Sequence, residues 1–284
     1  MQWILTFTCV DRVGIVSAVA GFLAERDGFI LDSQQFADLE SGHFFMRVLF
    51  QGAGPKFVDD GAKLSQDFEA IAARFSLQFD LKPADERRRI VIAVSKGSHC
   101  LTDLLHRWSS GTLPVEIAAI VSNHEHCRRL AEWHGVPYHF LPVTGDNRAE
   151  QEAAIMGVLE DSGSELLVLA RYMQILSGEM TDGLEGRAIN IHHSFLPSFK
   201  GSQPYHRAHD RGVKLIGATA HFVTGDLDEG PIIEQAVERV DHRATVDDMI
   251  RIGRDIESKV LARAVRLWGE RRLFLNGNRT VVFG

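Results

Sequence analysis

The residues best suited to chemistry lie close together in residues 190–201, which read NIHHSFLPSFKG. If a strand ends near Asn190, a spacing of two residues places the side chains of Asn190 and His192 on one face. Ligand sites of open α/β sheets lie beyond the carboxyl ends of the strands. An amide donor beside an imidazole suits a carbonyl oxygen that gains negative charge during nucleophilic attack. A buried polar pair that caps a strand would show the same pattern, so these residues alone leave both interpretations open.

A second group, residues 221–231, reads HFVTGDLDEGP and places several acids beside Gly and Pro. Such a run is typical of a solvated loop. Its position between two expected strands of one sheet favours a function instead. Asp228 precedes Glu229, Gly230 and Pro231, a turn that could aim the Asp228 carboxylate back at the end of the sheet.

Other groups carry weaker signals. Residues 95–99 lack both G-x-G-x-x-G and G-x-x-x-x-G-K-[ST], so no nucleotide loop is predicted. His192 and His193 should point to opposite faces of an extended chain, and residues 124–127 suit surface or cap positions of a helix better than half of a zinc site. Cys100, near a helix N-terminus, could be a nucleophile, but a core or pocket-lining role is preferred. We therefore expect no metal and no cofactor.

Two patterns of elements must position these residues. Residues 1–84 read as a βαββαβ unit, with a second helix opened by Pro55. Residues 85–284 alternate strand and helix patterns, which predicts an α/β domain on a mostly parallel, Rossmann-like sheet. The charged residues 82–89 are interpreted as the linker between the two. A capping box at 245–248 predicts a long helix, and Asn276-Gly277 predicts a hairpin.

The composition is that of an ordinary globular protein, with 45% hydrophobic and 24% charged residues in 284. A net charge of −7 argues against a nucleic-acid surface. No apolar run approaches the roughly 18 residues of a membrane span. No secretory signal is visible, and the three cysteines show no C-x-x-C spacing. We expect a cytoplasmic protein that binds neither nucleic acid nor membrane.

The pattern N-I-H-x-S-x-L-P, followed 38 residues after its Asn by the Asp of L-D-x-G-P, resembles the folate-dependent formyltransferase family, which includes glycinamide ribonucleotide formyltransferase. The resemblance implies a catalytic triad of Asn190, His192 and Asp228. Residues 169–176 resemble the folate-binding segment of that family, and with the loop 225–231 they imply a pterin pocket. The implied substrate contacts come from Arg171, Tyr172, Met173, Gln174, Ile175, Leu176, Gly225, Asp226, Leu227, Glu229 and Gly230.

Nearly the whole chain is similar to the formyltetrahydrofolate deformylase family. The marks are VSK at 94–96, HCL at 99–101, VSNH at 121–124, PYH at 204–206 and residues 212–233. In the loop of residues 95–100, Lys96, His99 and Cys100 replace the glycine-rich phosphate loop of the transferases, which fits water as the acceptor. The chain departs from the family at Ser202-Gln203, where Ala usually follows F-K-G.

This resemblance implies hydrolysis of 10-formyltetrahydrofolate to formate and tetrahydrofolate, which would balance the one-carbon folate pool and link it to purine biosynthesis. Asp228 would orient and deprotonate water, His192 would donate to the oxyanion, and Asn190 would fix the formyl oxygen. An unperturbed Asp has a pKa of about 3.9 and is a weak base unless its surroundings raise that value. An amine formyltransferase and a catalytically silent folate or amino-acid sensor remain the alternatives.

The N-terminal unit resembles the ACT-type regulatory domain of that family, which implies an amino-acid effector. The implied contacts are Asp11, Arg12, Gly14 and Ile15, and Val10 and Val13 stand where the family usually has prolines. The unit could instead serve only to assemble a homodimer or homotetramer.

Overall fold

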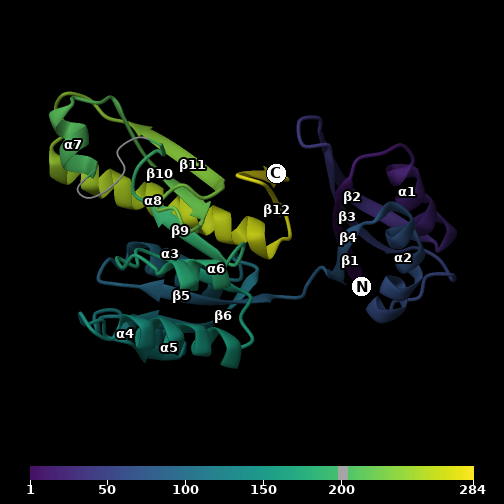
Figure 1. Ribbon diagram of the computed structural model, residues 1–284, viewed down its shortest axis with the longest axis horizontal. Helices are drawn as coiled ribbons and strands as arrows, with labels where there is room; N and C mark the ends of the chain where they lie inside the picture. The colour runs from purple at the N-terminus through teal and green to yellow at the C-terminus, as the bar shows by residue number, and fades with distance from the viewer. Residues whose placement is uncertain (198–203) are drawn as a thin grey trace. The chain divides into compact units, whose positions relative to one another are not determined.

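The computed structural model describes residues 1–197 and 204–284, which form two compact units (Figure 1). Unit 1 comprises Met1–Glu86, Glu270–Asn276 and Val281–Gly284, and unit 2 comprises Arg87–Gly269 and Gly277–Thr280. The boundary expected between 84 and 85 lies two residues before the observed one. Most of the residues after 269, which the sequence interpretation placed in the second domain, belong to unit 1. The expected Phe199-Lys200-Gly201 and Ser202-Gln203 positions lie outside the described residues.

Unit 1 is a four-stranded antiparallel sheet with two helices packed on one face. Its elements follow the order β1 (Gln2–Val10), α1 (Ile15–Glu25), β2 (Gly28–Asp38), β3 (His43–Gly52), α2 (Gly61–Phe75) and β4 (Gln78–Pro83). The strands lie in the order β2-β3-β1-β4. Alternate residues of β1 and β3, such as Phe7 and Val48, pack against Val19 of α1 and Phe68 of α2, because successive side chains of a strand point to opposite faces. The expected βαββαβ order is confirmed.

The second helix of unit 1 begins at Gly61 and not at Pro55. Asp60 is extended, and its carboxylate accepts hydrogen bonds from the backbone N–H groups of Ala62 and Lys63. This N-cap satisfies two of the backbone N–H donors that the first turn of a helix leaves without an intrahelical partner. Phe57 instead packs edge-on against Phe50, with ring centroids 6.2 Å apart.

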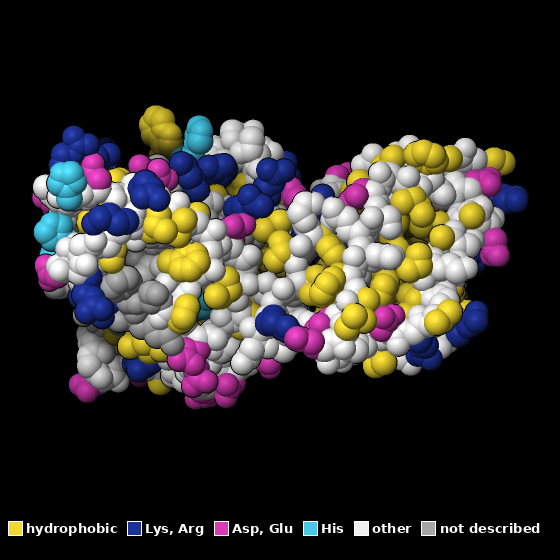
Figure 2. All heavy atoms as spheres, turned by 90° about the horizontal axis from the view of Figure 1, so that it is seen from above, with side chains coloured by type: hydrophobic (Ala, Val, Ile, Leu, Met, Phe, Trp, Pro, Cys, Tyr) yellow, Lys and Arg dark blue, Asp and Glu magenta, His cyan; other side chains and the backbone are white. Residues whose placement is uncertain are grey.

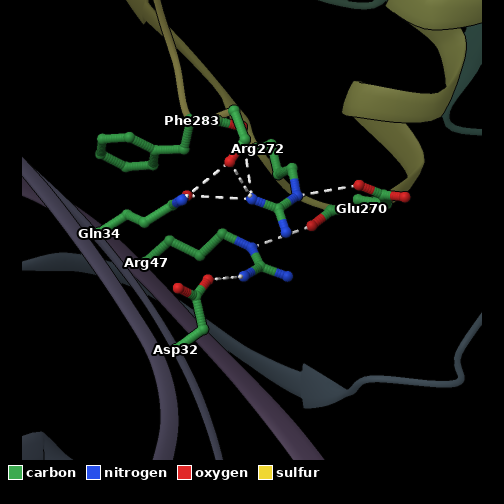
Figure 3. Close-up of polar contacts among 7 residues, drawn as sticks. Asp32, Gln34, Arg47, Glu270, Arg272 and Phe283 are labelled. Carbon is green, nitrogen blue, oxygen red and sulfur yellow. Dashed lines mark hydrogen bonds and ion pairs between the residues drawn. The ribbon is translucent and has the colours of Figure 1, made fainter.

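The other face of the unit 1 sheet is covered in part by residues 270–276 and 281–284, here called the return segment. Phe45, which is 1% exposed, packs with Val281 and Phe283 of this segment. Beside it, the buried Arg47 donates through Nε to the carbonyl oxygen of Glu270 at 3.1 Å and through a terminal nitrogen to Asp32 at 3.4 Å (Figure 3). The return segment therefore completes the packing of a sheet formed by residues far earlier in the chain.

Arg272 ties the return segment to the second strand of the sheet. Its guanidinium donates to Gln34 Oε1 at 3.0 Å and to the carbonyl oxygen of Gly284 at 3.1 Å (Figure 3). Burial and the neighbouring Arg272 lower the pKa of Arg47 to about 10, so the Arg47 guanidinium stays charged at neutral pH.

The surface of unit 1 carries several exposed apolar side chains. Figure 2 shows hydrophobic side chains gathered over this unit. Phe29, Leu31 and Phe36 of β2 and Leu39 after it are all exposed. Isolated surface hydrophobics are ordinary, but here several exposed apolar residues lie on or directly after one strand, β2.

Unit 2 is built on a seven-stranded sheet in the order β11-β10-β9-β8-β5-β6-β7. The parallel strands are β5 (Arg88–Val94), β6 (Val115–Ser122), β7 (Tyr138–Phe140), β8 (Leu166–Leu169) and β9 (Ala188–His192). The strands β10 (Leu215–Phe222) and β11 (Ile232–Arg239) extend it in antiparallel fashion. The expected mixed, mostly parallel sheet is confirmed.

Helices cover both faces of this sheet. They are α3 (His99–Ser109), α4 (Arg128–Trp133), α5 (Arg148–Asp161), α6 (Gly178–Gly183), α7 (Pro204–Asp210) and α8 (Val246–Gly269). Ile155 of α5 and Met180 of α6 pack on Val91 and Leu167, and Figure 1 shows α8 on the opposite side of the sheet from α5. The capping box is present, since Thr245 and Asp248 exchange side-chain and backbone hydrogen bonds. Among the described residues no helix has the length and apolar character needed to cross a membrane.

Two further details concern the ends of unit 2. The expected linker 82–89 is shorter than predicted, because β4 runs to Pro83 and β5 starts at Arg88. Arg88 is not a free linker residue, since it pairs with Glu165 at 2.9 Å and stacks on Trp268. The hairpin predicted at Asn276-Gly277 is confirmed as β12 (Leu273–Asn276) and β13 (Arg279–Val282).

Candidate active site

The register between β9 and β10 brings three polar side chains to one face of the sheet. Asn190 lies opposite His221, and His192 lies opposite Thr219. Residues two apart on a strand share a face, and so do directly opposed residues of an antiparallel pair. The side chains of Asn190, His192 and His221 therefore converge where β9 ends.

The loop between β10 and β11 supplies the fourth group. Asp228 has a left-handed backbone, with φ of 58°, a conformation that Asp and Asn tolerate better than most residues. Its Oδ1 lies 3.1 Å from His192 Nδ1 and 3.8 Å from His221 Nε2. Gly230 makes this turn possible, because a Cβ there would lie 1.8 Å from the carbonyl oxygen of Phe222.

The hydrogen bonds of His221 fix the orientation of the Asn190 amide. His221 Nδ1 lies 2.8 Å from the carbonyl oxygen of Phe222, which can only accept, so this nitrogen carries the proton. Nε2 then accepts from Asn190 Nδ2 at 3.2 Å. Burial lowers the pKa of His221, which keeps the ring neutral at pH 7. The second N–H of the Asn190 amide is left to bind an oxygen in the pocket.

Asp228 is ionised and His192 presents one unused nitrogen. Burial alone would raise the pKa of Asp228, but the hydrogen bond and charge of His192, with His221, outweigh it and hold this pKa below its ordinary value. The raised pKa that would make Asp228 a stronger base is not observed.

His192 is 4% exposed, and its Nε2 has no hydrogen-bond partner among the described residues. A buried ring nitrogen without a partner suits a ligand atom.

These side chains border a pocket of about 660 Å³. Of the residues expected to contact substrate, Arg171 to Leu176 and Gly225 to Leu227 line it, whereas Glu229 and Gly230 do not. Gly230 instead lies against the backbone of Phe222 and lets the loop approach the end of β10. Met173, Ile175 and Leu227 are each more than half exposed and give the pocket an apolar wall.

The segment after β8 is held in place by Ser95, which follows β5. The N–H of Ser95 donates to the carbonyl oxygen of Arg171, and its hydroxyl accepts from the N–H of Met173 at 3.0 Å. The same hydroxyl donates to Asn123 at 2.8 Å. Arg171 itself is left-handed, with φ of 64°. The ends of three neighbouring strands thus fix the pocket wall.

A second buried polar cluster adjoins the pocket. Glu257 of α8 is 1% exposed. It accepts from Tyr205 at 2.7 Å and from His99 Nε2 at 2.8 Å, and its Oε2 lies 3.4 Å from Arg171 Nε. The sequence interpretation missed this cluster, although a charged residue directly after Ile256 on the apolar stripe of α8 was a visible signal. It also did not propose His221, which the register alone places opposite Asn190.

His193 lies where the sequence interpretation did not expect it. Its ring centroid is 5.0 Å from that of His192, and both rings line the pocket. The expectation of opposite faces was wrong because β9 ends at His192, so the strand alternation does not extend to the next residue. Burial and the charge of Arg171 lower the pKa of His193 to about 4.

One group of described residues has metal-ligand spacing, namely His99, Cys100 and Glu257. The Glu257 carboxylate already accepts hydrogen bonds from Tyr205 and His99 and forms an ion pair with Arg171. Burial raises the pKa of the Cys100 thiol far above its ordinary value, which opposes both metal binding and nucleophilic attack. In residues 124–127, Glu125 pairs with Arg128 and Cys127 is buried at the start of α4.

The residues expected to bind an effector lie at the start of α1. The N–H of Asp11 donates to the carbonyl oxygen of Gly42 at 2.8 Å, and the Arg12 guanidinium lies 5.4 Å from the Phe75 ring centre. Gly14 is the left-handed N-cap, and Ile15 is buried. Asp11 and Arg12 are therefore exposed to a ligand, whereas Ile15 belongs to the core.

Comparison with known proteins identifies the family of this chain. Residues 88–265 match the family model for formyl transferase. A formyltetrahydrofolate deformylase of Corynebacterium sp. is 47% identical, over 99% of this chain and 98% of that protein. The crystal structure of formyltetrahydrofolate deformylase from Burkholderia mallei is 51% identical, with a TM-score of 0.95 over 100% of this chain and 99% of the other. Glycinamide ribonucleotide transformylase 1 from Symbiobacterium toebii is 32% identical, with a TM-score of 0.66 over 70% of this chain and 95% of that one.

The chain therefore belongs to the formyl transferase family. The relatives that match it over its whole length are formyltetrahydrofolate deformylases.

Proposed function

We propose that this chain hydrolyses 10-formyltetrahydrofolate to formate and tetrahydrofolate. The convergence of Asn190, His192 and Asp228 on one pocket carries the proposal, with Asp228 Oδ1 3.1 Å from His192 Nδ1. The same activity is named for relatives that are 47% and 51% identical.

Each of the three side chains has a separate role in the attack of water on the formyl carbon. Asp228 accepts a hydrogen bond from a water molecule and, because its pKa is below the ordinary value, takes the proton only as the new C–O bond forms. His192 Nε2, which has no hydrogen-bond partner in residues 1–197 and 204–284, donates to the oxyanion when the ring is protonated. The Asn190 amide binds the same oxygen. The C–N bond then breaks, and the departing nitrogen takes a proton relayed through water from Asp228 or His192.

The apolar wall of the pocket suits a pterin ring. We assign substrate contacts to residues 171–176 and 225–227, which line the pocket, and a supporting role to Glu229 and Gly230. Backbone groups held by Ser95 fix the wall, so that a flat heterocycle meets a rigid surface.

One assay without an acceptor tests this function. Purified protein is incubated with 10-formyltetrahydrofolate, and formate and tetrahydrofolate are both quantified. We expect the two products in equal amounts. Formylation of added glycinamide ribonucleotide faster than formate release would make the protein an amine formyltransferase, and the absence of both reactions would make it a sensor.

We further propose that unit 1 is an ACT-type regulatory domain. Its element order and antiparallel sheet support this, as does the exposure of Asp11 and Arg12 beside the N-terminus of α1. An amino acid is the proposed effector, and glycine and methionine are the first to test. A constant rate of formate release across both titrations would leave unit 1 with assembly alone.

The remaining proposals concern setting and assembly. We place the enzyme in the cytoplasm, where reduced thiols such as the unpaired Cys9, Cys100 and Cys127 are usual. It works without a cofactor, supplies formate and balances the one-carbon folate pool that serves purine biosynthesis. The exposed apolar residues of β2 favour a homodimer or homotetramer, which mass measurement in solution tests.

A further inference from the structure

Glu257 is a buried carboxylate that borders the pocket of the candidate active site. Its Oε1 accepts from the Tyr205 hydroxyl at 2.7 Å, and its Oε2 accepts from His99 Nε2 at 2.8 Å with Arg171 Nε at 3.4 Å. Leaving a buried charge unpaired is costly, and these two hydrogen bonds and the ion pair with Arg171 offset that cost. None of the chemical steps assigned above uses any of the four residues.

The charge state of the cluster follows from its contacts. Burial alone would raise the pKa of Glu257, but the His99 hydrogen bond and the charge of Arg171 hold it below the ordinary value. Burial raises the pKa of Tyr205, so its hydroxyl keeps the proton that it donates. At neutral pH the cluster is therefore an ionised carboxylate held by fixed donors, which leaves little freedom to any of its members.

The cluster is continuous with the catalytic side chains through packed rings. The Tyr205 ring centre lies 6.3 Å from that of His193, and the His193 ring centre lies 5.0 Å from that of His192. On its other side the Tyr205 hydroxyl approaches Gly253 of α8 so closely that a Cβ there would lie 1.9 Å away. The helix thus has a glycine at the point where Tyr205 must reach Glu257.

We propose that Glu257 is a positioning residue that sets the choice of nucleophile. Through Tyr205, His99 and Arg171 it holds a rigid wall beside His192, and this wall admits water to the formyl carbon while excluding larger nucleophiles. The inference rests on the proposed hydrolytic function and deepens it. A nucleophile must approach to about 3–3.5 Å of the carbon that it attacks. Because His99, Arg171 and Tyr205 line the same pocket as Asn190 and His192, their fixed positions limit the size of the nucleophile that can make this approach.

Hydroxylamine is a suitable probe, because it is a strong nucleophile only slightly larger than water. In hydrolysis the water oxygen bonds to the formyl carbon and formate is released. In the competing reaction the hydroxylamine nitrogen bonds to that carbon, giving formohydroxamate. In both cases the same C–N bond breaks, tetrahydrofolate leaves with a proton from the nucleophile, and no oxidant is needed.

The experiment measures the ratio of formohydroxamate to formate made from 10-formyltetrahydrofolate at fixed hydroxylamine concentration, after subtraction of the enzyme-free rate. The variants Glu257→Gln and Tyr205→Phe weaken the contacts that hold the wall, and Gly253→Ala displaces Tyr205 by a clash with its hydroxyl. The matched control is Tyr138→Phe, which removes a hydroxyl bonded to the carbonyl oxygen of His124 and does not border the main pocket. Thermal unfolding shows which variants remain folded.

We expect wild-type enzyme and Tyr138→Phe to give formate almost alone, and the wall variants to raise the product ratio at least about tenfold. A lowered rate with an unchanged ratio in Tyr205→Phe and Glu257→Gln would overturn the inference and leave hydrolysis intact. Tyr205→Phe keeps the ring in place, so it decides the matter if Glu257→Gln fails to fold. Wild-type enzyme that releases no formate would overturn the proposed function and the inference with it.

Discussion

Asp228 combines an unusual backbone conformation with the proposed role of base, and this makes one substitution especially informative. Asn adopts the left-handed conformation (φ of 58°) as readily as Asp, but it cannot accept a proton from water. Asp228→Asn should lower kcat for formate release by at least about 10²-fold, with KM and the melting temperature near those of the wild type.

Asp228→Ala is the comparison that separates chemistry from backbone strain. Ala is strained at this φ, so this variant should lose stability as well as activity. Turnover near the wild-type rate in Asp228→Asn would remove the carboxylate from the mechanism.

His193 should make stability depend on pH. Burial and the charge of Arg171 lower its folded-state pKa to about 4, whereas an unfolded His titrates near 6.5. Between these values the unfolded state binds more protons, so stability is lost as pH falls from about 6.5 towards 4, by at most about 1.4 kcal/mol per pH unit. Urea midpoints at pH 7, 6 and 5 should therefore fall less steeply in His193→Asn than in the wild type, and parallel curves would contradict this.

The residue pattern predicted that Asn190, His192 and Asp228 act together, and the structure brings all three to one pocket, but the pattern did not predict the residues around them. Asn190, His192 and Asp228 could be identified because their spacing is characteristic of a known family. His221 and Glu257 could not be assigned, because their roles depend on a strand register and on a tertiary contact between α8 and α3. The lowered pKa of Asp228 likewise depends on His192 and His221, which only the fold brings near it.

The loop that carries Asp228 has no space for a side chain at Gly230. A Cβ there would lie 1.8 Å from the carbonyl oxygen of Phe222, so Gly230→Ala must displace the loop or β10. We expect a loss of about 1–3 kcal/mol in unfolding free energy together with reduced turnover, measured by urea denaturation and formate release. Gly225→Ala is the control for stability, since the nearest atom to its added Cβ lies at 3.9 Å.

The elements themselves were largely predictable from periodicity, and the errors have local causes. The helix expected from Pro55 begins at Gly61 because Asp60 supplies a better cap. The charged stretch at 82–89 was interpreted as linker, but its cations include Arg88, which pairs with Glu165. In both cases the sequence shows the residue types, while the partner that decides their structure lies elsewhere.

At the scale of the whole molecule, the return segment determines which fragments of the chain are soluble by themselves. Removing residues 1–86 only would leave Phe274 and Phe283 without Phe45, and exposed aromatic residues promote aggregation. We expect a protein of residues 87–284 to be less soluble than one of residues 87–269, as measured by size-exclusion chromatography. Equal behaviour of the two fragments would show that the contact of the return segment with unit 1 is unimportant for solubility.

The return segment also sets an order of events during synthesis. Residues 270–284 leave the ribosome only after all of residues 87–269, yet they supply the aromatic cover of Phe45 and the carbonyl oxygen that accepts from Arg47. Domains generally fold as they emerge from the ribosome. In this chain, however, the unit 1 sheet lacks the return segment on one face until unit 2 has been translated. A chain whose translation stops before residue 270 therefore contains the complete sheet of unit 2, but one face of its unit 1 sheet stays uncovered. Chaperones and proteases can recognise the aromatic residues exposed on that face.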